Sequence, residues 1–203
     1  MTKMTSRLFT TLLVLIGLTA FGQLRDSIYV KTEIFEVVYS EVLEQPKWLK
    51  YNSTNRPKNV DRTGLDFYKV PYIYTSDNAD YAKNTFDKGH LAPAASFADS
   101  EENMKATFSY LNCALQHQDL NRGEWRLLEE QERAWDSSEN LEILVKVVFG
   151  KESYQLPSGA TVPTRFEKHI YFTKKKTWAC YDFPNEKPLN KWPQYLFVCQ
   201  IHR

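Results

Sequence analysis

The sequence has few cysteines and none of the common zinc-binding motifs. Three of its 203 residues are cysteine, and neither Cys-x-x-Cys nor His-Glu-x-x-His occurs. The histidines at positions 117, 169 and 202 are not paired at the spacing of metal ligands. The sequence therefore argues against a zinc site.

An excess of charge of either sign is also lacking. Lysine and arginine number 26 and aspartate and glutamate 25, which gives a formal net charge of +1. Bulk charge thus predicts no polyanionic partner, and any nucleic-acid interface would depend on a local cluster. The candidates are Arg56, Lys58 and Arg62, or the lysines at 174–176, although a solvated turn is the simpler interpretation of the lysine triplet.

The N-terminal 22 residues are typical of a cleavable signal peptide. Lys3 and Arg7 precede an apolar run over residues 8–21, with small residues just before Gln23. The run contains Thr and Gly and is shorter than the ~20 residues that a membrane span requires. No cysteine stands at the expected cleavage point after Gly22, as a lipoprotein would need.

We therefore expect a mature domain of residues 23–203 that is periplasmic or secreted and has no membrane attachment after cleavage. Loss of Lys3 and Arg7 lowers the formal charge from +1 to −1. This length fits one domain, and no linker, repeat or low-complexity tract divides it.

Local patterns predict an α+β domain with a largely antiparallel sheet. Helical spacing of apolar residues predicts helices over residues 100–111 and 121–135. Aromatic and β-branched residues predict strands in six segments, residues 27–40, 67–75, 143–150, 168–173, 177–183 and 195–200.

The stretch FDKGHLAPAASF, residues 86–97, presents a single histidine, His90. The preceding glycine permits a sharp turn, and Leu-Ala-Pro-Ala-Ala offers no polar side chain that competes for the imidazole. The pattern indicates a presented base. A histidine with an ordinary satisfied hydrogen bond is the plainer alternative.

Asn121 and Glu129 form a second candidate pair. At ~100° per residue, eight residues come to about 80° beyond two helical turns, so both side chains can serve one side of a helix. A neutral amide oxygen and a carboxylate suit Mg²⁺. The alternatives are a helix cap for Asn121 and a solvated position for Glu129.

Two longer segments carry a family resemblance. DKGHLAPAASF and FSYLNCALQHQDLNRGEWRLLEEQER resemble the DNA/RNA non-specific endonuclease family, whose motif is Asp-Arg-Gly-His followed later by Leu-Asn-x-x-x-Trp-x-x-Leu-Glu. Asn121 follows His90 by 31 residues, and Trp125 and Glu129 fall in register. The resemblance covers most of residues 35–203.

The resemblance implies a ββα-metal nuclease fold, with a central largely antiparallel sheet flanked by helices. It implies Mg²⁺-dependent hydrolysis of phosphodiester bonds in DNA and RNA, with Mn²⁺ as a possible substitute. His90 would be the general base, and one Mg²⁺ would be held directly by Asn121 and through water by Glu129.

Four further residues acquire roles from the resemblance. Lys88 replaces the family's arginine, which keeps the charge but loses the planar fork that grips phosphate. Arg62 is the candidate for the transition-state arginine, with Arg56 and Lys58 as alternatives. Asp87 and Asn112 are expected to orient the site. A proline usual in the family is absent before Gln116, so we expect the local loop to differ.

The cysteines are expected to form one disulfide. Export places the chain in an oxidising compartment, where thiols that meet should pair. Cys180 and Cys199 lie in predicted strands joined by a Pro-rich connection, whereas Cys113 lies beside the predicted site. We predict a Cys180–Cys199 disulfide and an unpaired Cys113. Three buried, reduced cysteines are the alternative.

Two other functions stay open at this point. A nucleic-acid-binding protein of the same fold without turnover is one, although the presence of His90, Asn121 and Glu129 disfavours it. A hydrolase that uses Cys113 with His117 as its base is the other, although no orienting group is evident.

Overall fold

The computed structural model describes residues 23–199. The predicted signal peptide, residues 1–22, lies outside the described residues, so export stays a prediction. Between residues 23 and 199 the structure has no helix with the length and apolar character needed to cross a bilayer.

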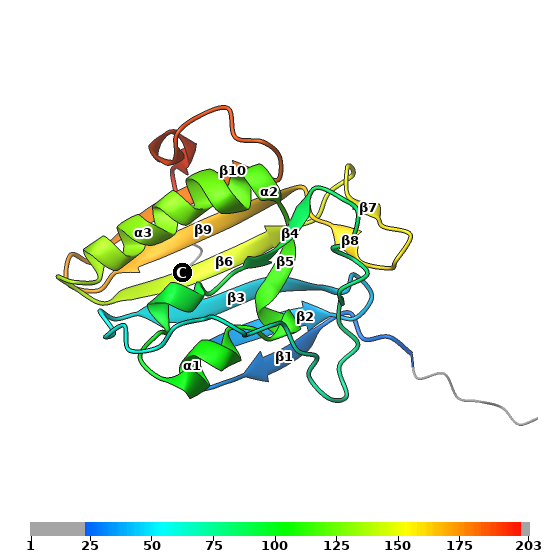
Figure 1. The fold of residues 1–203 in the computed structure, drawn as a ribbon. Coiled ribbons are helices and arrows are strands. Elements are labelled where there is room, and N and C mark those ends of the chain that lie inside the picture. The colour runs from blue at the N-terminus through cyan, green and yellow to red at the C-terminus, as the bar shows by residue number, and fades with distance from the viewer. Residues whose placement is uncertain (1–22, 200–203) are drawn as a thin grey trace, which may run out of the picture.

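A seven-stranded antiparallel sheet forms the centre of the fold (Figure 1). Its order is β1-β2-β3-β6-β9-β10-β11. The strands are β1 Ile28–Lys31, β2 Phe35–Ser40, β3 Gln45–Ser53, β6 Leu141–Val148, β9 Arg165–Phe172, β10 Thr177–Pro184 and β11 Leu196–Phe197. Two antiparallel pairs stand apart from it, β4 Phe86–His90 with β5 Cys113–His117, and β7 Tyr154–Gln155 with β8 Thr161–Val162.

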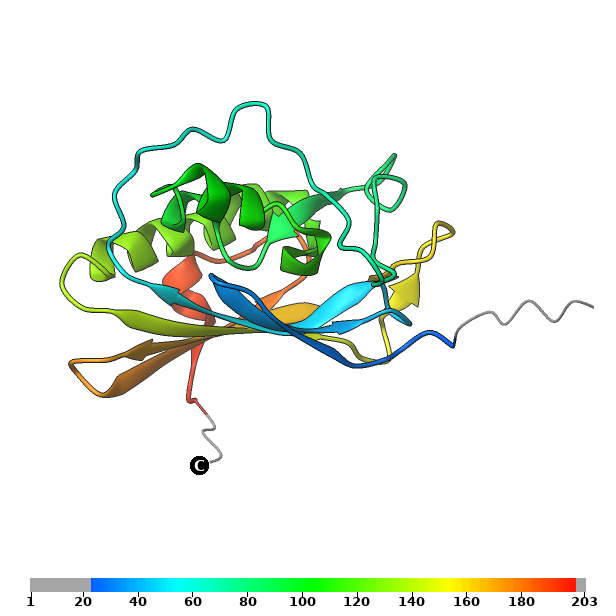
Figure 2. The same ribbon diagram turned by 90° about the horizontal axis from the view of Figure 1, so that it is seen from below.

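The helices lie on one face of this sheet together with the β4–β5 pair (Figures 1 and 2). The longest helical run comprises α2 Gln118–Leu120, the π-helical turn η3 Asn121–Trp125 and α3 Arg126–Trp135. Shorter helices are α1 Glu101–Ala106, η1 Ala94–Ser96, η2 Tyr110–Asn112 and η4 Trp192–Tyr195. The connection of residues 54–85 arches over the helical side in Figure 2.

The main core lies between the sheet and α3. Successive strand residues point to opposite faces, so Leu49 and Tyr51 of β3 are buried while Lys50 between them is exposed. Trp125 packs against the core with its ring 5.6 Å from that of Phe166. Fully burying one large apolar side chain contributes about 1.5–3 kcal/mol, so this stripe holds the helix on the sheet.

The α+β class and the largely antiparallel sheet are confirmed, but some element boundaries were wrong. Residues 67–75 form an irregular connection rather than a strand. Pro71 cannot donate to a strand ladder, and Tyr72 has a positive φ of 66°. Residues 27–40 form two strands separated by a tight turn, in which Thr32 Oγ1 accepts a hydrogen bond from the Phe35 amide.

The predicted helices also differ at their ends. The first is α-helical only over Glu101–Ala106 and then gives way to the η2 turn. The second begins earlier, at Gln118, with His117 as the N-cap that accepts the Asp119 amide at 3.2 Å. Asn121 is therefore not the N-cap of this helical run, and that alternative is wrong.

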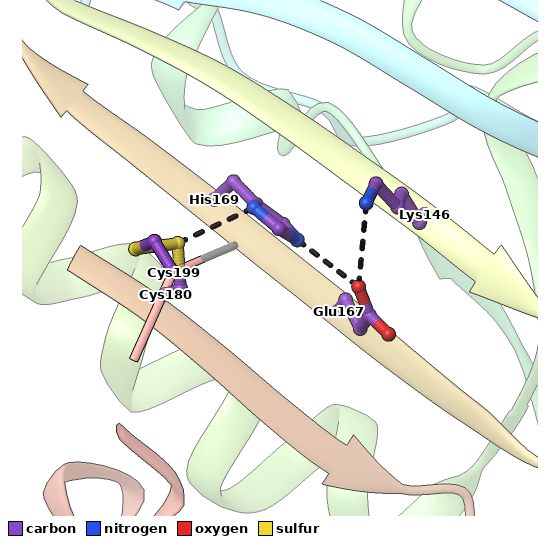
Figure 3. The surroundings of a disulfide bond; sticks show 5 residues. All are labelled: Lys146, Glu167, His169, Cys180 and Cys199. Atoms are coloured by element: carbon purple, nitrogen blue, oxygen red, sulfur yellow. Dashed lines mark hydrogen bonds and ion pairs between the residues drawn. A yellow bond between two sulfur atoms is a disulfide. The ribbon is translucent and has the colours of Figure 1, made fainter. Parts of the chain in front are cut away.

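Cys180 and Cys199, the pair proposed from the sequence, are disulfide-bonded in the structure, with Cα atoms 5.5 Å apart (Figure 3). Cys113 is free and buried. The bridge fastens the segment after β11 to β10, beside the β10–β11 pairing of Cys180 with Phe197.

Replacing Cys180 and Cys199 together by serine is expected to lower the free energy of unfolding by about 3 kcal/mol in the chain-entropy model. Urea denaturation of the oxidised protein and the double variant measures this difference. A Cys113→Ala variant, which keeps the bridge, is the control. Equal midpoints and slopes for the double variant and the wild type would show that the bridge adds no stability.

Candidate active site

The β4–β5 pair fixes the backbone on both sides of His90. In this pair His90 lies opposite Cys113. Asn112 fixes the backbone just after His90. Its Oδ1 accepts a hydrogen bond from the Ala92 amide at 2.8 Å, and its Nδ2 donates to the Ala92 and Thr107 carbonyls at 2.9 and 2.8 Å. Asn112 is fully buried and thus orients the segment that follows His90.

The His90 ring packs against two phenylalanines, Phe67 and Phe108, which also contact each other. Its centroid is 4.8 Å from that of Phe67 and 5.0 Å from that of Phe108. The Nε2 atom is enclosed and has no hydrogen-bond partner, whereas Nδ1 is not enclosed in this way. Nδ1 is therefore the ring nitrogen that we assign to contact with a water molecule.

The ionisation of His90 follows from the same surroundings. Burial, together with a smaller effect of the positive charge of Arg62, lowers the pKa of His90 from its ordinary 6.5 to about 3. The ring is therefore neutral at pH 7 and has a lone pair with which to accept a proton.

Arg62 and Arg56 occupy different settings on the connection of residues 54–85. Arg62 is exposed, and within residues 23–199 no carboxylate lies at ion-pair distance from it. The Arg56 guanidinium instead contacts Asp99 at 2.7 Å and lies 5.2 Å over the ring of Phe97. Of the two arginines, Arg62 is the one whose charge acts on His90.

Lys88 is held on the same side of β4 as His90, because the two residues are two apart on one strand. Its Nζ contacts Asp66 Oδ1 at 3.2 Å and also donates to Asn78 Oδ1. The ammonium group lies 5.3 Å over the ring of Phe67. Positive charge is thus fixed beside the aromatic pocket of His90.

Asp87 positions Asn121. The Asn121 Nδ2 atom donates to Asp87 Oδ2 at 2.9 Å, and Arg122 donates to both Asp87 oxygens at 2.8 and 2.6 Å. Burial would raise the pKa of Asp87, but these hydrogen bonds outweigh it and hold the pKa below its ordinary value. Since the amide nitrogen is engaged, the Asn121 Oδ1 atom is left to bind a ligand.

Glu129 lies farther along the run, facing β9. Its Oε1 atom is enclosed without a hydrogen-bond partner and lies 4.0 Å from Lys168 Nζ. Burial raises the pKa of Glu129 to about 7, Lys168 opposes this shift, and Glu132 reinforces it. Lys168 is fully buried and forms a shorter ion pair, 2.9 Å, with Glu132.

The helix between Asn121 and Glu129 is not regular. The η3 turn is π-helical, and Gly123 departs from helical geometry with φ −104° and ψ −112°. Asn121 and Glu129 are therefore not related by ~100° per residue, and the predicted placement of both on one side of a regular helix is wrong. Asn121 contacts β4 through Asp87, whereas Glu129 faces Lys168 of β9, and the hydrogen bonds of the structure do not join them.

Asn121 and Glu129 offer the oxygen donors that a hard divalent cation prefers, although no hydrogen bond joins the two side chains. Within residues 23–199 no group of three or more His, Cys, Asp or Glu side chains is suited to hold a metal. Asn121 Oδ1, which Asp87 orients, is one donor available to such an ion, and the orphaned Oε1 of Glu129, beside Lys168, is the other. Both are oxygen donors, and Mg²⁺ accepts few protein ligands because it keeps most of its water.

Gly89 is needed where β4 lies close to the Gln116 side chain of β5. A Cβ atom at this position would overlap the side chain of Gln116, which is buried. We expect Gly89→Ala to lower the free energy of unfolding by about 1–3 kcal/mol and to reduce activity by shifting His90. Urea denaturation and a nicking assay measure both effects.

Gly150→Ala is the matched control, because a Cβ atom there meets only Thr164 at ordinary contact distance, 3.7 Å. If both alanine variants matched the wild type, the close approach at Gly89 would have no consequence.

Some residues of the site were not identified from the sequence. Phe67 and Phe108 enclose His90, Arg122 holds Asp87, and Lys168 faces Glu129. Arg122 had a usable signal, since it adjoins Asn121. The others come from distant segments, and no local pattern marks them.

The hairpin that presents His90 and the adjoining helix that presents Asn121 define a ββα-metal nuclease fold, as the resemblance implied. The chain belongs to the DNA/RNA non-specific endonuclease family, whose family model matches residues 20–198. The predicted family and the predicted fold are thereby confirmed.

Several characterised proteins are similar to this chain. Mitochondrial nuclease EXOG of Danio rerio is 32% identical over 96 residues, which are 45% of this chain and 28% of that protein. Human mitochondrial endonuclease G is 39% identical over 77 residues, 36% of this chain and 26% of that protein. Nuclease C1 of Cunninghamella echinulata var. echinulata is 30% identical over 116 residues, 53% and 45% of the two chains. The matched segments thus span less than half of each relative.

A solved structure shares the fold. It is described as the crystal structure of the EndoG/EndoGI complex, and it superposes with a TM-score of 0.73 at 21% identity. The alignment covers 84% of this chain and 80% of the other. At this identity the similarity concerns the fold.

Proposed function

We propose that this protein is a divalent-metal-dependent endonuclease that hydrolyses phosphodiester bonds in DNA and RNA. The main support is the match to the DNA/RNA non-specific endonuclease family together with the position of His90, which the β4–β5 pair holds on the same strand face as Lys88. Asn121, oriented by Asp87 so that its Oδ1 is available, is the second support.

Each side chain then has a defined task. His90 Nδ1 takes a proton from the attacking water. Arg62 and Lys88 supply positive charge to the phosphate oxygens. Asn121 Oδ1 would hold a Mg²⁺ ion directly and Glu129 would hold it through water, with Mn²⁺ as a substitute. The bound ion supplies charge neutralisation at the phosphate and at the departing 3′ oxygen.

Little base or sugar discrimination follows from this set of contacts. Arginine, lysine and a metal ion would contact phosphate groups, and phosphate contacts carry no direct sequence information. We therefore propose both DNA and RNA as substrates, cleaved without a defined sequence. The export features of residues 1–22 support a periplasmic or secreted location.

The hydrolase that uses Cys113 and His117 is not favoured. Burial raises the pKa of the Cys113 thiol to about 12, so a thiolate is scarce at neutral pH. The two residues stand at opposite ends of β5. At about 3.3 Å per residue, their Cα atoms are roughly 13 Å apart, too far for a nucleophile and its base.

A nicking assay tests the proposed function. Supercoiled plasmid and single-stranded RNA are incubated with the protein in Mg²⁺, in Mg²⁺ with excess EDTA, and after treatment with N-ethylmaleimide. We expect cleavage of both substrates, loss of cleavage with EDTA, and indifference to alkylation. No cleavage in any condition would favour a binding protein without turnover, and loss on alkylation alone would favour the cysteine mechanism.

A further inference from the structure

The disulfide lies on the sheet face opposite the helices, at one end of a chain of polar contacts (Figure 3). Cys180 of β10 is opposite His169 of β9, and its Sγ atom is 3.3 Å from His169 Nδ1. His169 Nε2 is 3.1 Å from Glu167 Oε2, which is 3.5 Å from Lys146 Nζ. The nuclease site on the other face uses none of these residues.

Glu167 fixes the role of each His169 nitrogen. A carboxylate only accepts hydrogen bonds, so Nε2 carries a hydrogen and donates it to Glu167. The Nδ1 atom of the neutral ring then directs its lone pair at the Cys180 sulfur. It can take up a proton, and the resulting imidazolium would lie beside any negative charge that forms on that sulfur.

The two sulfur-bearing residues differ in access. Cys180 is fully buried, whereas Cys199 is partly exposed and follows Val198, which is 88% exposed. A thiolate from solution therefore meets Cys199 first. Cys180 is the member of the pair that has a base beside its sulfur.

We propose that this disulfide is a site of thiol exchange, at which a small thiol is attached to Cys199 while Cys180 leaves. The thiolate sulfur bonds to Cys199 Sγ, the Cys180–Cys199 bond breaks, and its electron pair goes to Cys180 Sγ. The proton that the small thiol gives up to the solution is balanced by one that His169 Nδ1 takes up. The resulting imidazolium stabilises the Cys180 thiolate, and leaving groups of lower pKa depart faster. A second small thiolate attacks the attached sulfur, which leaves both cysteines reduced and the small thiol as its own disulfide.

The exchange would release the end of a segment that contacts the helical run. The Trp192 amide donates to Glu124 Oε2 at 2.8 Å, and Lys191 Nζ lies 3.2 Å from Glu124 Oε1. Glu124 belongs to the η3 turn. The bridge at Cys199 is the covalent fastening of this segment to the sheet.

Peptide mapping tests the direction of exchange. The full chain carrying Cys113→Ala is incubated with glutathione, quenched with acid, alkylated and digested. We expect glutathione on the Cys199 peptide and the alkyl group on the Cys180 peptide in the first adduct. Glutathione chiefly on Cys180, or equally on both, would overturn the proposal.

Rates test the role of His169. In the same background, His169→Phe is expected to slow the first exchange by on the order of tenfold, because the leaving thiolate loses its partner. Glu167→Gln keeps the ring in place and should slow exchange by a smaller factor. Tyr171→Phe, two residues along the same strand and face, is the control.

Circular dichroism establishes that each variant is folded. If His169→Phe does not fold, Glu167→Gln decides the question alone. Wild-type exchange rates in the folded variants would show that the imidazole has no part in the exchange.

Discussion

His90→Ala is expected to lower the rate of phosphodiester cleavage by about 10² to 10⁴-fold, the usual cost of losing a general base. Nδ1 of His90 is the ring nitrogen that we assign to contact with water, and its lowered pKa keeps it unprotonated at neutral pH. The fold should persist, because the β4–β5 ladder and the Asn112 hydrogen bonds involve backbone atoms that the substitution leaves in place.

The measurement is the initial rate of plasmid nicking in saturating Mg²⁺, with circular dichroism to establish folding. His169→Ala, which removes a histidine from the opposite face of the sheet, is the matched control and should nick at the wild-type rate. A folded His90→Ala protein with near-wild-type turnover would remove His90 from the mechanism.

Local pattern was sufficient where the apolar residues of an element are buried on one face. The stripe that includes Trp125 and Leu128 predicted the helix because both side chains are buried against the sheet. Strand β9 was recognisable from its aromatic and β-branched residues. In contrast, β4 contains Asp87, Lys88 and Gly89, a sequence with little intrinsic strand preference. Its pairing with β5, more than twenty residues later, decides its conformation.

Residues 67–75 show that a strand-like composition alone does not produce a strand. Their tyrosines and β-branched residues predicted a strand, yet strand formation needs a partner as well as composition. Tyr68 forms only an isolated bridge to Ser109. Pro71 then prevents continuation of a ladder. The segment remains part of the irregular connection, and its Phe67 ring contacts His90.

The candidate site could be predicted as a set of residue types but not as a geometry. Motif spacing indicated His90, Asn121 and Glu129. The contact between Asn121 and Asp87 spans 34 residues of sequence, and nothing local marks it. The departure from helical geometry at Gly123 likewise depends on how the run meets the rest of the fold, so the angular relation of Asn121 to Glu129 could not be derived from helical periodicity.

Asn121→Ala is expected to reduce cleavage at limiting Mg²⁺ by more than about 100-fold, because it removes the directly coordinating oxygen of the proposed site. Glu129→Gln should cost less, on the order of tenfold, since a group that acts through water is more easily replaced by solvent. Asp87→Asn should have an intermediate effect. It leaves the Asn121 side chain present but weakens the charged hydrogen bonds that orient it.

Nicking rates measured across a range of Mg²⁺ concentrations separate loss of metal affinity from loss of folding. For Asn121→Ala we expect the half-saturating Mg²⁺ concentration to rise and the plateau rate to fall, whereas the far-ultraviolet spectrum should not change. Asn103→Ala is the matched control, because Asn103 Nδ2 also donates to an aspartate, Asp99, at 3.0 Å on the α1 side of the fold. If Asn121→Ala and Asn103→Ala gave the same curve as the wild type, the Asn121 amide would be a structural partner of Asp87 and the metal would have to bind elsewhere.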